Sequence, residues 1–146
     1  MTGTTSSRAI EGSCHCGNLR YTLFWPGGDG AIPVRACSCS FCRKHGGVYT
    51  SHPNARVEIR IADESRVRRY RFGTKTADFH VCLGCGVVPV ITGTIEEQLH
   101  AVVNVNCFEG IDPSELKSAV ADFEGETTES RLERRQRTWI PDVSFG

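Results

Sequence analysis

The chain has 146 residues, a length that suits one domain with one hydrophobic core. Its 17 basic side chains balance its 17 acidic ones, so neither nucleic acid nor an anionic membrane is expected as a partner. The segment from Met1 to Gly12 lacks the apolar centre of a signal peptide, and no later apolar run is long enough to cross a bilayer, which indicates a soluble, cytoplasmic protein.

The elements predicted along the chain are mainly short strands. Leu19, Tyr21 and Leu23 alternate with polar residues, as in a half-buried strand, and residues 57–61 repeat the pattern. Further strands are expected over residues 67–72, 79–82, 87–92, 101–107 and 119–123. Turn-forming residues separate these segments, so the pattern predicts an all-β fold, either an open barrel or a sandwich of antiparallel sheets, with few short helices.

Helix is scarce in this sequence. Short turns are expected at residues 95–99 and 112–114, and the charged segment from Thr128 to Arg137 can form a helix that buries little. We expect residues 1–10 to be a flexible N-terminal segment and residues 11–146 to be a single domain with a charged tail from about residue 126.

Eight cysteines are the most informative part of the composition. An even number would suit disulfides in a secreted domain, but cysteines one or two residues apart in three clusters are typical of metal binding in a reducing compartment. The absence of a signal sequence favours metal. Zinc would also stabilise a modest core, since only 39% of the residues are apolar.

Two of the clusters together predict a structural zinc site with four thiolate ligands. In an extended chain, Cys14 and Cys16 point to the same side, while Cys82 and Cys85 flank a glycine-rich turn in which Gly84 and Gly86 permit positive φ. Four cysteines close a tetrahedral shell. A redox dithiol at residues 82–85 is the weaker alternative because no βαβ pattern surrounds it, and His15 is expected to point away into solvent.

The remaining cluster supplies three ligands from one loop: Cys37, Cys39 and Cys42. Three protein ligands and an open fourth position characterise catalytic zinc. Zinc with three thiolates carries a formal charge of −1, so it should activate a bound thiol better than water. The alternative is a closed site in which His45 or Cys107 provides the fourth ligand.

Basic residues follow this cluster directly. Arg43 and Lys44 could bind carboxylates of an acidic substrate, or could be solvated cations. A second basic run over residues 66–75 alternates with apolar residues, as on the wet face of a strand. A nucleic-acid-binding zinc ribbon is therefore the weaker interpretation of a neutral chain.

The three clusters in order resemble the glutathione-dependent formaldehyde-activating enzyme family, which also contains centromere-protein-V-like proteins. The resemblance covers residues 11–125 and rests on three motifs: Gly12-Ser13-Cys14-His15-Cys16-Gly17, Cys37-x-Cys39-x-x-Cys42-Arg43-Lys44-x-Gly46 and Phe79-x-x-Cys82-x-x-Cys85-Gly86. It implies an Mss4-like zinc fold with two zinc ions per chain. It also implies that the four-cysteine zinc is structural and that the three-cysteine zinc is catalytic.

The resemblance further implies that a glutathione thiol adds to formaldehyde, giving S-hydroxymethylglutathione, which is a carbon–sulfur lyase reaction in the reverse sense. We therefore expect a zinc-dependent enzyme whose partners are a small thiol such as glutathione and an aldehyde. The competing hypothesis is a non-enzymatic zinc module, either a glutathione carrier or an Mss4-like interaction or chaperone domain.

Overall fold

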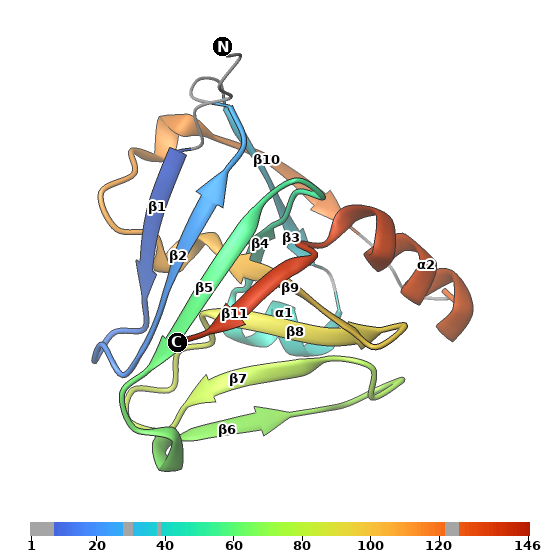
Figure 1. The fold of residues 1–146 in the computed structure, drawn as a ribbon, viewed down its shortest axis with the longest axis horizontal. Helices are drawn as coiled ribbons and strands as arrows, with labels where there is room; N and C mark the ends of the chain where they lie inside the picture. The colour runs from blue at the N-terminus through green and yellow to red at the C-terminus, as the bar shows by residue number, and fades with distance from the viewer. Residues whose placement is uncertain (1–7, 28–30, 38, 122–125) are drawn as a thin grey trace.

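Two β-sheets and a few short helices make up the computed structural model, which describes residues 8–27, 31–37, 39–121 and 126–146 (Figure 1). The first sheet has the strand order β1-β2-β5-β11 and the second has the order β10-β3-β4-β9-β8-β7-β6. The all-β prediction is therefore confirmed.

The strands of the first sheet are β1 (Arg8–Ser13), β2 (Leu19–Trp25), β5 (Arg56–Ile61) and β11 (Asp142–Phe145). Those of the second sheet are β3 (Ile32–Cys37), β4 (Val48–Thr50), β6 (Val67–Tyr70), β7 (Asp78–Cys82), β8 (Val90–Ile95), β9 (Gln98–Asn104) and β10 (Leu116–Ala121). The helices are α1 (Ser40–His45) and α2 (Thr128–Thr138), and three 3-10 turns span Glu64–Arg66, Val105–Cys107 and Pro113–Glu115.

Most strand pairs are antiparallel, as the pattern predicts, but two edge strands pair in parallel. The strand β10 lies parallel to β3, and β11 lies parallel to β5. Parallel neighbours need a long connection between them, and both pairs join segments far apart in the chain. The strand predicted over residues 119–123 corresponds to β10, although residues 122 and 123 lie outside the described part.

The N-terminal strand starts earlier than the boundary expected from the sequence. Residues 8–10, expected to be flexible, form the first half of β1, which pairs with β2 from Arg8 opposite Trp25 to Ser13 opposite Arg20. The physical reason is burial, because Ile10 is only 1% exposed. A single buried apolar side chain leaves too weak an alternation to predict this strand.

The main core lies between the two sheets. Tyr21, Leu23 and Ile59 of the first sheet are fully buried and share one hydrophobic cluster with Val90 and Val103 of the second. These residues occupy alternate positions on their strands, as the period of two predicts. The Tyr21 hydroxyl also donates a 2.9 Å hydrogen bond to the Asn104 carbonyl, which links the two sheets through polar groups.

The C-terminal tail belongs to the domain rather than extending from it. Thr127 caps α2, its side chain accepting a hydrogen bond from the Ser130 amide. Trp139 and Ile140 are then buried, and Ile140 exchanges backbone hydrogen bonds of 2.9 and 3.0 Å with Ala101. The two apolar residues that follow the charged helix thus anchor it, which its own composition did not predict.

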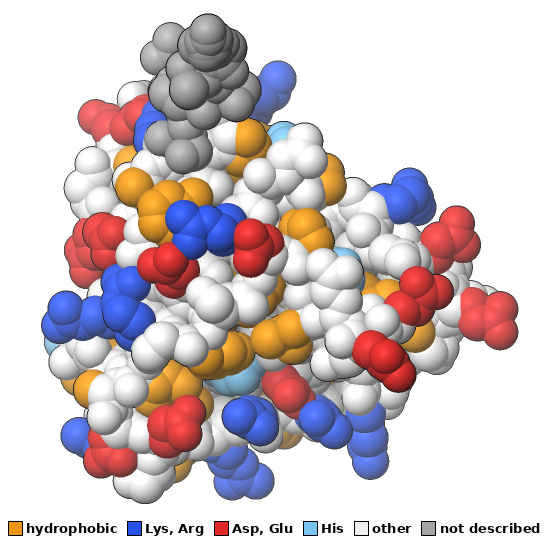
Figure 2. All heavy atoms as spheres, viewed as in Figure 1, with side chains coloured by type: hydrophobic (Ala, Val, Ile, Leu, Met, Phe, Trp, Pro, Cys, Tyr) orange, Lys and Arg blue, Asp and Glu red, His pale blue; other side chains and the backbone are white. Residues whose placement is uncertain are grey.

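The basic run of residues 66–71 lies on and beside β6, the edge strand of the second sheet. Figure 2 shows basic side chains over this edge with acidic ones among them. Charged side chains on an edge strand hinder pairing with other chains. Within the described ranges, no helix is long and apolar enough to cross a membrane.

We predict that Tyr21→Phe lowers the free energy of unfolding by about 1–2 kcal/mol, because the buried Asn104 carbonyl loses its donor. Urea denaturation of the metal-loaded protein measures this change. The matched control is Tyr70→Phe, whose ring is 40% exposed and should unfold as the wild type does. Equal stability of the two variants would contradict the proposed link between the sheets.

Candidate metal centres

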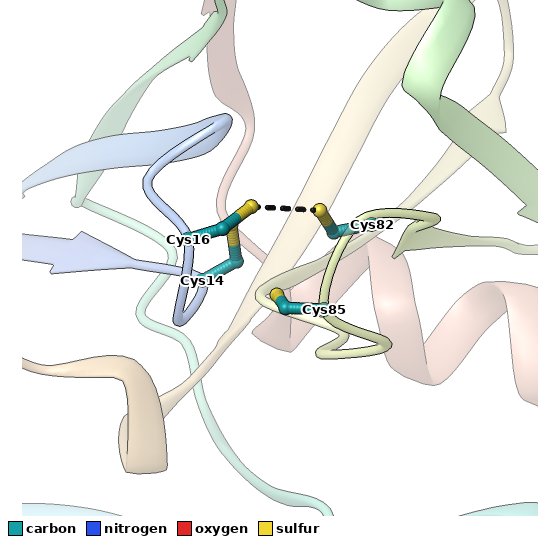
Figure 3. A group of neighbouring side chains, drawn as sticks. All are labelled: Cys14, Cys16, Cys82 and Cys85. Atoms are coloured by element: carbon teal, nitrogen blue, oxygen red, sulfur yellow. Dashed lines mark hydrogen bonds between the residues drawn. The ribbon is translucent and has the colours of Figure 1, made fainter.

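Four cysteine sulfurs converge where the first sheet meets the second (Figure 3). The sulfurs of Cys14, Cys16, Cys82 and Cys85 all lie within 4.8 Å of one another. The Sγ atoms of Cys14 and Cys16 are 3.7 Å apart, and those of Cys16 and Cys82 are 3.4 Å apart. Thiolates about 2.3 Å from a tetrahedral zinc would be about 3.8 Å apart, so the cluster fits such an ion and is too open for disulfides.

Each half of this cluster is a tight turn. Cys14 and Cys16 lie in the turn between β1 and β2, where the Cys14 amide donates to Leu19 and the Gly17 amide donates back to Cys14. The sulfurs of Cys14 and Cys16 therefore lie close together because the chain turns between them. The expectation that residues 14–16 are extended is wrong. In the other half, Gly86 has a positive φ of 82° while Gly84 does not. The Gly86 amide donates a hydrogen bond to the Cys82 carbonyl.

The backbone around the cluster favours thiolate at Cys85. Although burial raises its pKa, hydrogen bonds from the amides of Val87 and Cys16 lower the pKa of Cys85 to about 6. Thiolate is the form that binds metal, and amide donors also orient it. A bound ion would clamp the β1–β2 turn of the first sheet to β7 of the second.

The second cluster occupies the junction of β3 and α1. The sulfurs of Cys37, Cys39 and Cys42 lie within 4.8 Å of one another. Cys37 ends β3, and Cys39 caps α1 by accepting a 3.4 Å hydrogen bond from the Cys42 amide. The sequence predicted the three ligands but missed the six-residue helix that holds the third one, because so short a segment shows no helical period.

Hydrogen bonding makes the Cys37 thiol more acidic than that of Cys42. A hydrogen bond from the Cys42 thiol lowers the pKa of Cys37 to about 5, assisted by the nearby charge of Arg134. The same hydrogen bond and burial raise the pKa of Cys42. Cys37 and Arg134 line the same pocket, so the C-terminal helix lies beside this cluster.

A tyrosine and a histidine lie beside the second cluster. The Tyr49 hydroxyl is 3.3 Å from the Cys42 sulfur and 2.9 Å from His45 Nε2. A Cβ atom on Gly47 would lie 2.1 Å from that hydroxyl, so only glycine permits this approach. Burial raises the pKa of Tyr49 and lowers that of His45, which keeps both neutral at pH 7.

Neither candidate for a fourth ligand joins the second cluster. The His45 ring is hydrogen-bonded to the Tyr49 hydroxyl. Cys107 is buried in the main core beside Cys14, and this burial raises the pKa of the Cys107 thiol to about 12. Across the described ranges, the residues able to ligate metal here are the three cysteines alone. One ligand position on a tetrahedral ion would stay open.

A pocket of about 130 Å³ opens beside the three cysteines. Its lining includes three large aromatic side chains, those of Phe72, Phe79 and Trp139. It also includes four arginines: Arg35, Arg131, Arg134 and Arg135. Sequence reasoning gave none of the four a role, since β3 was not predicted and the helix over α2 was expected to bury little.

The basic residues predicted for substrate binding take another position. Arg43 and Lys44 lie on α1, are exposed, and are not among the residues lining this pocket. They belong to the last turn of the helix, where cations favour the negative end of its dipole. Their contact with a substrate stays a prediction.

Comparison with known proteins agrees with this architecture. Residues 9–126 match the family of glutathione-dependent formaldehyde-activating enzymes, and the chain belongs to that family. A crystal structure of a Rhodobacter sphaeroides protein is similar, with 29% sequence identity and a TM-score of 0.55 over 75% of this chain and 97% of the other. The matched family region ends just before α2.

We predict that Cys82→Ser lowers the bound metal by one equivalent per chain and lowers the melting temperature, because the clamp between the sheets loses a ligand. Metal analysis and thermal unfolding measure the two effects. Cys107→Ala is the matched control, a buried cysteine outside both clusters, and should keep the full metal content. Unchanged metal content in Cys82→Ser would contradict the assignment of this ligand.

Proposed function

We propose that this protein is a zinc-dependent enzyme of the carbon–sulfur lyase type that adds a small thiol, glutathione, to an aldehyde such as formaldehyde. One observation carries the proposal: three neighbouring cysteines line a pocket, and no fourth candidate metal ligand joins them among the described residues. Family membership supports the choice of glutathione and formaldehyde.

The two clusters have different roles in this proposal. Cys14, Cys16, Cys82 and Cys85 hold a structural zinc, because four thiolates complete its shell. Cys37, Cys39 and Cys42 hold the second zinc, which when bound keeps a substrate thiol deprotonated and nucleophilic at neutral pH. Ligands of this kind require a reducing compartment, which supports the cytoplasm as the location.

The Tyr49 hydroxyl positions one ligand of the second site. A thiolate accepts hydrogen bonds only, so the neutral hydroxyl donates to Cys42 Sγ and must itself accept from His45 Nε2–H. Burial keeps His45 neutral, so its ring can carry the proton on Nε2 alone. This chain of hydrogen bonds fixes the Cys42 sulfur and moderates its charge.

The pocket walls provide the environment for the addition. Phe72, Phe79 and Trp139 give the pocket an apolar lining beside the sulfurs, which would favour confinement of the two reactants over water. In the reaction a carbon–sulfur bond forms between the thiol sulfur and the carbonyl carbon. The thiol loses its proton and the carbonyl oxygen gains one, so the atoms balance without oxidant or reductant.

We predict that glutathione binds saturably to protein loaded with two zinc equivalents per chain, and that Cys42→Ser abolishes this binding because the second site loses a ligand. Calorimetric titration measures glutathione binding to the wild type and to Cys42→Ser. Cys107→Ala is the control variant and should bind glutathione as the wild type does. Because the adduct also forms without catalyst, exchange NMR of glutathione with formaldehyde should compare the rate with and without enzyme. Binding without rate acceleration would favour a glutathione carrier over an enzyme.

We predict that Tyr49→Phe weakens binding of the second zinc by about tenfold, a typical effect of removing a hydrogen bond to a metal ligand. Competition with a chromophoric chelator measures this affinity. The first zinc should be unaffected because Tyr49 does not touch the four-cysteine cluster, and Tyr70→Phe provides the control. A Tyr49→Phe protein with wild-type affinity at both sites would exclude the positioning role.

A further inference from the structure

The register of the second sheet orders the side chains that lie beside the three-cysteine cluster. Arg35 of β3 is opposite Tyr49 of β4, and Cys37 shares the face of Arg35 because it lies two residues further along the strand. Tyr49 is in turn opposite Asn104 of β9, so Val102, two residues before Asn104, lies on this face as well. The cysteine cluster therefore starts a row of side chains on the face of the sheet that is turned away from the main core.

The row continues as an apolar strip across three neighbouring strands. Val102 of β9 is opposite Ile91 of β8, and Ile91 is opposite Phe79 of β7. All three side chains line the pocket beside the cysteines, and each is 9% exposed or less. Adjacent strands lie about 4.8 Å apart, so the strip extends roughly 10 Å across the sheet.

Other apolar side chains complete this part of the pocket. Ala77 and Trp139 are buried in the same hydrophobic cluster as the strip, and Phe72 packs against that cluster. All three also line the pocket. A concave site lined by buried aliphatic and aromatic side chains is typical of one that binds an apolar part of a ligand.

Neither reactant named in the proposed function matches the strip. Formaldehyde has a single carbon and carries no substituent that could contact it. Glutathione is a charged peptide, and its amides and carboxylates would lose hydrogen bonds to water against apolar side chains. Larger aldehydes differ in this respect: their carbonyl carbon has to reach the thiol sulfur beside the cysteines, and their substituent would then lie along the strip.

We propose that Val102, Ile91 and Phe79 form the binding site for the substituent of the aldehyde, so that the substrates of this pocket are aldehydes with an aliphatic or aromatic group. The inference rests on the proposed function in that a thiol adds to the aldehyde at the three-cysteine cluster, and it names the class of electrophile. The bond changes are the same for every aldehyde. A carbon–sulfur bond forms, and the carbonyl oxygen gains a proton as the thiol loses one.

The first test varies the aldehyde while glutathione stays constant. Exchange NMR of the zinc-loaded protein should compare formaldehyde, acetaldehyde, butanal and hexanal, each as the ratio of the catalysed to the uncatalysed rate. From acetaldehyde upwards this ratio should rise by about threefold to fourfold for each methylene group that the strip buries. Propanethiol in place of glutathione, with formaldehyde as the aldehyde, should show no such gain.

Two variants and a matched control assign the gain to the strip. Ile91→Ala removes apolar contacts and Val102→Phe fills the space, so both should lower the preference for butanal over acetaldehyde at least threefold. Val90→Ala also loses a buried side chain from β8, but on the opposite face in the main core, and should keep the preference. Equal loss in the control would mean that general destabilisation causes the effect.

A probe without a carbonyl group separates this inference from the proposed function. 1-Hexanol cannot react, yet it should saturably shift the NMR signals of the Ile91 and Val102 methyl groups, and Val102→Phe should abolish the shift. Binding of hexanol without any catalysed addition would contradict the proposed function and keep the apolar site. The inference is overturned if the methyl signals do not move, if butanal gains nothing over acetaldehyde, or if the gain follows propanethiol instead of the aldehyde.

Discussion

The meeting of two distant cysteine pairs is the constraint on which this structure depends. The β1–β2 turn carries Cys14 and Cys16, and the end of β7 and the turn after it carry Cys82 and Cys85, so an ion bound among them would hold one sheet against the other. Ligand bonds to one ion would replace part of the apolar contact that a domain of this size otherwise needs. The second cluster can then remain incomplete, because the fold does not require it to close.

The second cluster lies beside a pocket of mixed character. The cap of α1 orients Cys39 and the Tyr49 hydroxyl contacts Cys42, while both apolar side chains and arginines line the pocket.

The C-terminal segment illustrates how burial overrides local composition. Thr128 to Arg137 is strongly charged, and its charge pattern gave no sign of a packed helix. Trp139 and Ile140 nevertheless anchor it against β9, and β11 completes the first sheet. This anchoring brings three arginines of α2 to the pocket beside the second cluster.

The sequence by itself predicted the seven cysteines that the structure gathers into two clusters able to hold metal, the strands with clear alternation and the all-β fold, because cysteine spacing and side-chain period are local properties. It could not locate β1, β3 or α1, whose patterns are too short. Only the tertiary structure decided that Cys107 joins the core rather than a metal cluster. It also decided that Arg35 and Arg134 line the pocket while Arg43 does not. These neighbours are far apart in sequence, and the packing of two sheets, not local preference, brings them together.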